Sequence, residues 1–370
     1  MKKILFLIHD LGQGGAEKVL VNLVNNLNSD EFDITVMTLF DIGVNKQFLN
    51  DRIHYKSVFK TVFRGNSHIM KLLSPRMLHR FFVRDQYDIE IAFLEGPSAR
   101  VISGCDSSET KKVSWIHATQ SSGEKAASSF RNIAEAERCY NSFDRIVFVS
   151  QGVKQAFITS LKIVVQTEIL YNVNDSETIK NLCKEEVSEC SFPTNEFKII
   201  CIGKLENNKG FDRVIRCVSR LQKEGYHIHA YFLGTGSKQT DLIECAKTYK
   251  VDSSITFLGY HTNPYKFISK CDLFVCASYR EGFSTATTEA LIVGTPVCST
   301  DVAGAKEMLG EHNEYGIVTE NNDESLYKGI KTLVCNPEKL SMYKSRAIER
   351  GNAFSIQEAV KAVEKMLTEL

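Results

Sequence analysis

Two glutamates, Glu281 and Glu289, are the residues of this chain whose type and spacing best suit chemistry on a bound ligand. The segment Ala286–Val293 predicts a helix, so Glu281 should lie in the loop before it and Glu289 one to two turns inside it. Carboxylates in these places can accept hydrogen bonds from hydroxyl groups of a bound sugar or ribose. The apolar run Leu273–Cys276 predicts the buried strand that leads into this loop.

The start of this predicted helix is a candidate anion site. Ser284 or Thr285 can cap the helix, Gly294 can close it and Pro296 can stop it. The first amides of a helix are unpaired and lie at the positive end of its dipole, so a diphosphate can bind there. A glutamate near a helix start is also common for the dipole alone, so neighbouring motifs must decide between the two interpretations.

A glycine-rich turn follows the first predicted strand, Ile4–Ile8. Gly14 and Gly15 would let backbone amides approach a phosphate or a sugar, although such a turn can also serve chain reversal only. A dinucleotide fingerprint needs a small residue where this chain has Glu17. The turn therefore argues against a nicotinamide- or flavin-dependent oxidoreductase.

Further polar residues and glycines follow the predicted strands of the second half and one strand of the first. Lys204 and Lys209, five apart in one loop, can reach a diphosphate and stabilise a departing nucleoside diphosphate, whereas isolated loop lysines are usually only solvated. The carboxyl ends of parallel strands form the binding edge of an open sheet. His117 follows the predicted strand Val113–Ile116 at such an edge, where it can be either a sugar contact or a structural histidine. Backbone around a nucleotide is predicted at Gly203, Gly234, Gly259 and Tyr260.

Composition is that of an ordinary soluble globular protein with two domains. The chain has 370 residues, with 45 basic and 45 acidic side chains, so net charge indicates no nucleic-acid partner. Its eleven cysteines include no Cys-x-x-Cys pair and predict reduced, buried thiols of a cytoplasmic protein. The short apolar core near Met1 predicts a first strand and no signal peptide, and no run is long enough to span a membrane.

Strand-like and helix-like segments alternate throughout, which predicts two doubly wound parallel sheets. The polar segment Asn172–Glu196 is the natural boundary, so we expect domains at 1–172 and 173–351, with the terminal helix 352–370 as a separate element. The expected strands of the first half are Ile4–Ile8, Ile34–Leu39, Ile89–Phe93, Val113–Ile116, Ile146–Val149 and Ile169–Tyr171. Those of the second half are Lys198–Ile202, His229–Leu233, Ile255–Leu258, Leu273–Cys276, Pro296–Ser299 and Gly316–Val318.

Taken together, these motifs resemble the retaining glycosyltransferases of family 4, which have the two-domain GT-B fold. The resemblance covers nearly the whole chain and rests on motifs in the same order: Gly14–Glu17, His117, Val149–Ser150, Tyr171–Asp175, Gly203–Gly210 and Glu281–Pro296. It implies transfer of a sugar from a nucleotide donor, most simply a UDP-sugar, with retention at the anomeric carbon and without a bound metal or other cofactor. It also implies that the terminal helix 352–370 packs on the N-terminal domain.

The resemblance also implies a role for each matched residue. Lys204 and Lys209 would hold the diphosphate, Glu281 the donor sugar and Glu289 the ribose. Lys204 stands where relatives often have Arg, and Ser284 where they often have Gly, which bears on sugar preference. His117 would face the reacting carbon, with Gly14 and Gly15 closing from the other domain. Backbone contacts to sugar and phosphate would come from Gly282, Phe283, Ser284 and Thr285.

The segment 52–84 bears on the acceptor. It contains eight Lys or Arg and no Asp or Glu, interleaved with apolar residues. Such a segment can lie on an anionic membrane at the inner face of the plasma membrane, or pack on the N-terminal sheet with a solvated basic face. The first alternative suits a polyprenyl-diphosphate-linked glycan acceptor. A non-catalytic glycosyltransferase-like subunit and a nucleotide-sugar epimerase of the same fold are the competing functions.

Overall fold

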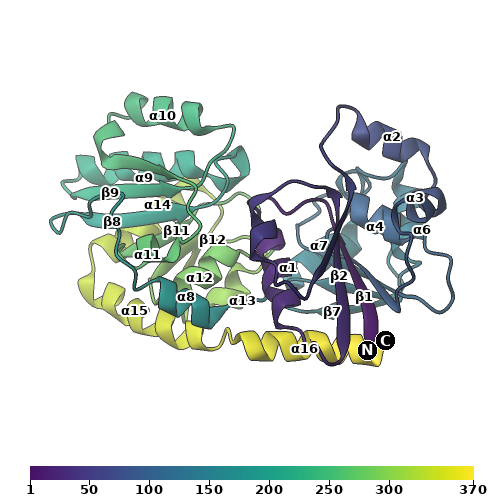
Figure 1. The fold of residues 1–370 in the computed structure, drawn as a ribbon. Coiled ribbons are helices and arrows are strands. Elements are labelled where there is room, and N and C mark those ends of the chain that lie inside the picture. Colours follow the sequence, from purple (N-terminus) through teal and green to yellow (C-terminus); the bar gives the residue numbers. More distant parts are fainter. The chain divides into compact units, whose positions relative to one another are not determined.

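The computed structural model describes residues 1–370, which form two compact units. Unit 1 comprises Met1–Val173 and Gln357–Leu370, and unit 2 comprises Asn174–Ile356, against expected boundaries at 172/173 and 351/352. The terminal helix α16 (Ile356–Glu369) passes the start of the first strand of unit 1, where Lys2 Nζ donates a 2.9 Å hydrogen bond to the Leu367 carbonyl (Figure 1). No helix of the chain is long and apolar enough to cross a bilayer.

Unit 1 contains a parallel sheet of seven strands in the order β3-β2-β1-β4-β5-β6-β7. Its central strands are continuous apolar runs, as expected for a sheet that helices cover on both faces. The strands are β1 (Lys2–Ile8), β2 (Phe32–Phe40), β3 (His54–Phe59), β4 (Ile89–Ala92), β5 (Lys111–Ile116), β6 (Arg145–Phe148) and β7 (Gln166–Ile169). The helices are α1 (Gly15–Asn26), α2 (Asn66–Leu72), α3 (Pro75–Phe82), α4 (Pro97–Ile102), α5 (Gly123–Ala126), α6 (Ile133–Tyr140) and α7 (Gln151–Ser160).

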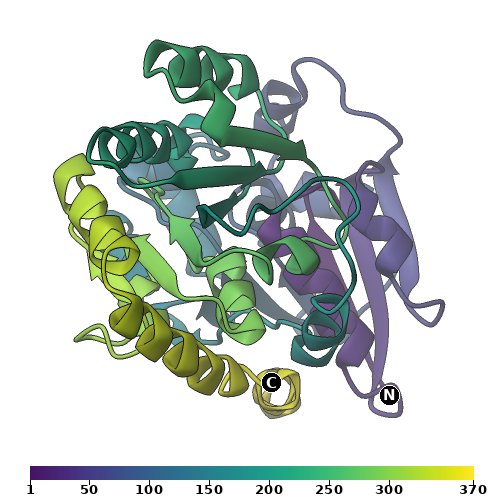
Figure 2. The same cartoon turned by 90° about the vertical axis from the view of Figure 1, so that its left-hand side faces the viewer.

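Unit 2 repeats this plan with six parallel strands in the order β10-β9-β8-β11-β12-β13. The strands are β8 (Phe197–Ile202), β9 (Ile228–Leu233), β10 (Ile255–Gly259), β11 (Leu273–Cys276), β12 (Val297–Thr300) and β13 (Ile317–Thr319). The helices, which cover both faces of the sheet (Figure 2), are α8 (Ser176–Leu182), α9 (Phe211–Lys223), α10 (Gln239–Thr248), α11 (Tyr265–Ile268), α12 (Thr285–Val293), α13 (Ala305–Leu309), α14 (Asp323–Val334) and α15 (Pro337–Asn352).

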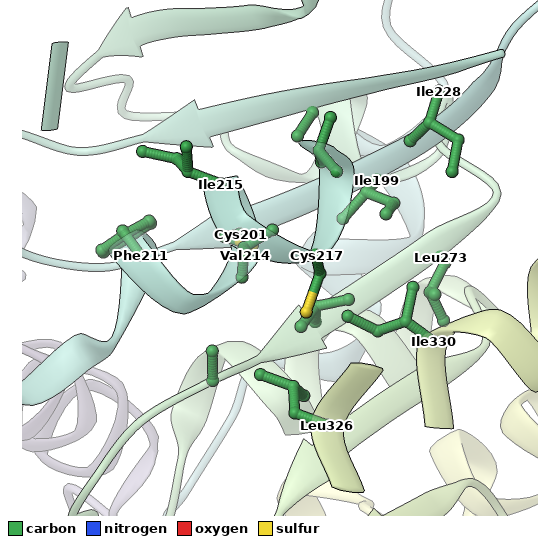
Figure 3. Packing of buried hydrophobic residues seen from close by; sticks show 14 of the residues in the cluster. Ile199, Cys201, Phe211, Val214, Ile215, Cys217, Ile228, Leu273, Leu326 and Ile330 are labelled. Atoms are coloured by element: carbon green, nitrogen blue, oxygen red, sulfur yellow. The ribbon is translucent and has the colours of Figure 1, made fainter. Parts of the chain in front are cut away.

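The core of unit 2 lies between its sheet and the helices α9 and α14. Val214 and Cys217 on α9 face Ile199 on β8, and Leu326 and Ile330 on α14 complete the cluster (Figure 3). All five side chains are almost fully removed from water. This packing fixes the ends of β8 and β11 relative to each other, which matters because the loops that follow both strands carry predicted site residues.

The predicted fold class is confirmed, since both units are doubly wound parallel sheets. Three local predictions need correction. A strand, β3, was not predicted, because its exposed edge position leaves it without an apolar run. The strand expected at Ile169–Tyr171 lies at Gln166–Ile169, and the terminal helix expected at 352–370 spans Ile356–Glu369.

Candidate active site

The candidate site of unit 2 is built around a lysine and a glutamate from neighbouring strand ends. Lys209 ends a short 3-10 turn after β8, and Glu281 follows β11, which pairs with β8. Lys209 Nζ lies 2.6 Å from Glu281 Oε1, and the Ser278 hydroxyl donates a second 2.6 Å hydrogen bond to the same oxygen. The strand order of unit 2 reverses between β8 and β11, which is where open parallel sheets bind ligands.

This pair lies in a pocket at the carboxyl ends of the two strands. Lys209 is 25% exposed and Glu281 is 12% exposed, so both charges are screened from bulk water but open to a ligand. Burial lowers the pKa of Lys209, but the charge and hydrogen bond of Glu281 outweigh it and raise the pKa above its usual value. The ammonium is therefore charged at neutral pH. The pocket is lined by Cys201, Ile202, Lys209, Phe211, Val214, Phe274, Val275, Cys276, Ala277, Ser278, Glu281 and Ser284.

Helix α12 begins at this pocket. The Ser284 hydroxyl accepts a 3.3 Å hydrogen bond from the Thr287 amide, so Ser284 is the cap and Thr285 is the first helical residue. Gly294 ends the helix in the left-handed conformation, with φ of 88°, as predicted. Gly282 and Phe283, between Glu281 and the cap, are buried. The amides of the first turn are thus placed next to the Lys209–Glu281 pair.

Glu289 lies one turn farther along α12 than the pocket residues. Its side chain is 4% exposed, and the Tyr265 hydroxyl donates a 3.4 Å hydrogen bond to Glu289 Oε1. Tyr265 itself is buried at the start of α11. The two glutamates of the sequence motif therefore differ in setting, because Glu281 contacts a cation and Glu289 contacts a neutral phenol.

Three predicted glycines lie at adjacent strand ends of unit 2. The Gly203 amide bonds to the Leu233 carbonyl and the Gly234 amide to the Gly259 carbonyl, which links the ends of β8, β9 and β10. Gly234 has φ of 135°, and a β-carbon there would lie 2.0 Å from the Gly203 carbonyl oxygen, so no other residue fits. Tyr260 follows β10 and is half-buried. Lys204 is exposed.

In unit 1 the glycine-rich turn leads into α1. Gly14 precedes the helix, and Gly15 is its first residue. A β-carbon on Gly14 would lie 2.0 Å from a carboxylate oxygen of Glu17, so the acid folds back over the turn. Glu17 thus complements the dipole of α1 itself. An anionic group is consequently less suited to this helix start than to that of α12.

His117 follows β5, and a carboxylate that was not predicted lies beside it. Glu95 follows β4 and accepts a 2.9 Å hydrogen bond from the His117 amide and a 3.4 Å hydrogen bond from Gln120. Burial raises the pKa of Glu95, although these hydrogen bonds oppose the shift. Burial lowers the pKa of His117 to about 3, so its ring is neutral, and its buried Nε2 has no hydrogen-bond partner.

A second titratable cluster lies elsewhere in unit 1. His79 on α3 and Glu90 on β4 form a 2.7 Å ion pair, and the ligand atoms of both lie within 4.8 Å of the Cys105 sulfur. These three residue types can hold a metal ion. Burial lowers the pKa of His79, but hydrogen bonds to Cys105 and Glu90 outweigh it and raise the pKa to about 9. The protonated ring therefore neutralises the buried Glu90 carboxylate.

The structure adds three residues to these sites that were not predicted from the sequence: Ser278, Tyr265 and Glu95. Glu95 was detectable, since it follows a predicted strand by the same rule that selected His117. Ser278 also follows a strand, but a serine there carries no charge to distinguish it. The contact of Tyr265 with Glu289 joins residues 24 positions apart and required the tertiary structure.

Known proteins resemble this chain along its whole length. A model described as Glycosyltransferase Family 4 matches residues 13–177, and one described as Glycosyl transferases group 1 matches residues 184–350. An N-acetylgalactosamine-N,N'-diacetylbacillosaminyl-diphospho-undecaprenol 4-alpha-N-acetylgalactosaminyltransferase from Campylobacter jejuni is 26% identical over 361 residues, 96% of each chain. The O-antigen biosynthesis glycosyltransferase WclY from Escherichia coli is 26% identical over 172 residues, 46% of each chain.

Solved structures show the same fold. HepE from Anabaena, in complex with UDP and glucose, superposes with a TM-score of 0.82 at 21% identity, over 100% of both chains. The same protein in complex with UDP-glucose gives a TM-score of 0.80. Staphylococcus aureus TarM, in a complex that contains UDP, gives 0.76 at 15% identity over 100% of this chain and 99% of that one. These likenesses establish a GT-B fold.

Proposed function

We propose that this chain, a glycosyltransferase built from a Family 4 domain and a group 1 domain, moves a hexose-type sugar from a UDP-sugar to a lipid-linked glycan with retention. The observation that carries the proposal is the Lys209–Glu281 pair beside the start of α12, at the switch point of unit 2. A cation next to the amides of a helix start suits a diphosphate, and a fixed carboxylate next to both suits the hydroxyls of the attached sugar.

In the proposed reaction the acceptor hydroxyl attacks the anomeric carbon on the face from which the diphosphate leaves. The bond from that carbon to the diphosphate oxygen breaks, the new glycosidic bond forms on the same face, and the diphosphate takes the hydroxyl proton. Lys209, with Lys204 from the exposed side of the loop, and the amides of Gly282 to Thr285 stabilise the charge on the leaving group. The lysines and the helix amides stabilise the leaving group without a metal ion in this proposal, so a chelator should leave turnover unchanged.

The other predicted residues have supporting roles in this proposal. Glu281 accepts hydrogen bonds from the donor sugar, and Glu289, held by Tyr265, accepts them from the ribose. Backbone at Gly203, Gly234, Gly259 and Tyr260 borders the nucleotide. In unit 1, Gly14 and Gly15 approach the donor sugar, His117 offers its unpartnered Nε2 near the reacting carbon, and Glu95 accepts a hydrogen bond from the acceptor hydroxyl.

The proposal that the acceptor is a lipid-linked glycan is supported by the Campylobacter relative, whose name includes diphospho-undecaprenol and an alpha linkage. Such an acceptor would place the enzyme at the inner face of the plasma membrane as a peripheral protein. The names of the relatives are those of transferases, which favours transfer over epimerisation. The Lys209–Glu281 pair also favours a working enzyme over a non-catalytic subunit, because holding two partly buried charges is costly where no ligand has to be bound.

A panel assay tests the proposal. The chain is incubated with UDP-, GDP- and dTDP-sugars, with and without a short lipid-linked glycan, and nucleoside diphosphate release is measured. Acceptor-dependent UDP release is expected, with the anomeric configuration of the donor kept in the product. Glu281→Ala should abolish release while the variant still folds, and full turnover of that variant would refute the assignment. UDP should also raise the melting temperature, by an amount set by RT ln(1 + [L]/Kd).

A further inference from the structure

The α2–α3 hairpin of unit 1, residues 60–84, exposes more large apolar side chains than a solvated surface requires. A single exposed apolar residue is normal, but a group of them marks a contact surface. Two of these side chains come from α2 or the turn at its end, two from α3 and one from the preceding loop. They are Val62 (51% exposed), Ile69 (49%), Leu72 (77%), Met77 (44%) and Phe81 (54%).

The exposed residues are distinct from those that attach the hairpin to unit 1. Met70, Leu78 and Val83 are buried at 7%, 1% and 5% exposure, and Phe82 packs edge-on against Phe59 at 5.5 Å between ring centroids. The segment therefore has an inward set that packs and an outward set that does not. The segment thus packs on the domain, as one of the two alternatives drawn from the sequence expected, and its outward set of apolar side chains stays exposed.

Two arginines fix the hairpin in place. Arg100 donates to the carbonyls of Met70 and Leu73 at 2.6 and 2.9 Å, and Arg131 donates to those of Lys71 and Leu72 at 2.8 and 2.7 Å. These contacts satisfy the carbonyls at the end of α2, while the Leu72 side chain points into solvent. The outward face is therefore preorganised and loses little conformational freedom when it binds.

The charges of the segment indicate which kind of surface its exposed apolar side chains can bind. The segment 52–84 contains eight Lys or Arg and no acidic residue. Lys56 pairs with Asp85, and Arg76 pairs with Asp106. Lys60, Arg64 and Arg80 are exposed, and no carboxylate pairs with any of the three. Cations interleaved with projecting apolar side chains match a surface with anionic headgroups above hydrocarbon.

We propose that the α2–α3 hairpin binds an anionic lipid surface, with Leu72 and Phe81 inserted and Lys60, Arg64 and Arg80 at the headgroups. This inference rests on the proposed function in one respect, that a lipid-linked acceptor is met at a bilayer. The hairpin then holds unit 1 against the membrane. Its contacts are with the lipid surface and not with the acceptor, so binding requires no acceptor in the vesicle.

Co-sedimentation of the full chain with vesicles tests this surface. Vesicles of phosphatidylcholine alone are compared with vesicles that contain phosphatidylglycerol, in the absence of donor and acceptor. Binding is expected only to the anionic vesicles and should weaken as salt rises. The triple variant Lys60→Glu/Arg64→Glu/Arg80→Glu should lose on the order of 100-fold in partition, since each basic residue near the headgroups contributes about fivefold. Leu72→Ser/Phe81→Ser should lose at least tenfold.

Matched controls carry the same changes on unit 2. Lys247→Glu/Lys270→Glu/Lys344→Glu repeats the charge reversal at exposed lysines, and Met342→Ser/Ile348→Ser removes side chains that are 46% and 50% exposed on α15. Both controls should bind vesicles as the native chain does. Far-ultraviolet circular dichroism and UDP binding establish that each hairpin variant is folded.

Three results would overturn the inference. The first is that the hairpin variants bind anionic vesicles as well as the native chain does. The second is that the native chain binds neutral and anionic vesicles equally, and the third is that it binds vesicles only after a polyprenyl-diphosphate is added. The last result would assign the hairpin to the acceptor itself. Failure of the proposed function is separable, because vesicle binding is measured without substrates and transfer is measured with a detergent-dispersed acceptor that needs no vesicle.

Discussion

Replacing Lys209 by methionine tests the electrostatic core of the candidate site. The variant keeps an unbranched apolar stem and removes the ammonium that lies 2.6 Å from Glu281 Oε1. In the free enzyme this ammonium is held by Glu281, and in the proposed reaction it faces a diphosphate whose charge increases as the sugar leaves. The loss should therefore be larger in the transition state than in the complex with the intact UDP-sugar, where this charge has not yet developed.

The magnitude follows from the kind of contact removed. One hydrogen bond to a charged group contributes about 1.5–3 kcal/mol, and loss of one donor to a developing oxyanion lowers turnover by about 100- to 1000-fold. Because Lys209 is only 25% exposed, water replaces it poorly. We expect kcat/KM of Lys209→Met to fall by about 100- to 1000-fold, and the affinity for the intact donor by about tenfold, or about 1.4 kcal/mol.

The assay measures acceptor-dependent UDP release over a range of donor concentrations and, separately, the binding of UDP and of the intact donor without acceptor, by titration calorimetry. Lys209→Arg should recover about tenfold of the loss, since it restores the charge but not the compact ammonium. Lys247→Met, on the exposed side of α10, is the control and should stay within about threefold of the native rate. A folded Lys209→Met variant with kcat/KM within about threefold of native would refute the reasoning. Equal losses in the affinity for the intact donor and in kcat/KM would also refute it, because they would show uniform binding without preference for the transition state.

Three further predictions concern single residues. Ser278→Ala removes the hydrogen bond from the Ser278 hydroxyl to Glu281. In the same two assays it should lower kcat about fivefold to tenfold and leave the affinity for UDP unchanged. A matching loss of affinity for UDP would count against a positioning role. Glu95→Gln keeps a hydrogen-bond acceptor for the His117 amide but removes the charge, so the rate of sugar transfer should fall about tenfold while the rate of donor hydrolysis stays constant. Because the pKa of Glu95 is raised, the activity of the native chain should decline on the acid side at a pH above the usual glutamate pKa. His79 has its pKa raised to about 9 in the folded chain, so the stability it gives to unit 1 is complete below about pH 6.5 and is lost as pH rises to about 9, a difference of about 3 kcal/mol. Urea unfolding followed by the fluorescence of Trp115, the single tryptophan of the chain, should show this loss, and His79→Gln should remove it; an unchanged pH dependence in that variant would contradict the assignment.

The sequence was most informative where a feature depends on local pattern. Strands with continuous apolar runs were placed to within a few residues, and Ser284 and Gly294 marked the ends of α12, because caps and periodicity are properties of neighbouring residues. The edge strand β3 has no such run and was missed. Spacing made Lys204 and Lys209 equivalent, yet only Lys209 meets Glu281, since that contact depends on β8 and β11 being neighbours.

The two units share one topology but differ in the charges at their switch points. In unit 2 the loops after β8 and β11 bring Lys209, which is paired with Glu281, to the start of α12, so an ammonium and the amides of a helix start are both available to an anion. In unit 1 the corresponding strands β1 and β4 are followed by Asp10 and Glu95, and Glu17 folds over the start of α1. His117 adds no positive charge, because its pKa is lowered to about 3. Unit 1 therefore suits a neutral hydroxyl that donates hydrogen bonds, and unit 2 suits the nucleoside diphosphate. In the proposed reaction, the chemical difference between acceptor and leaving group thus corresponds to a difference in side chains at equivalent places of a repeated fold.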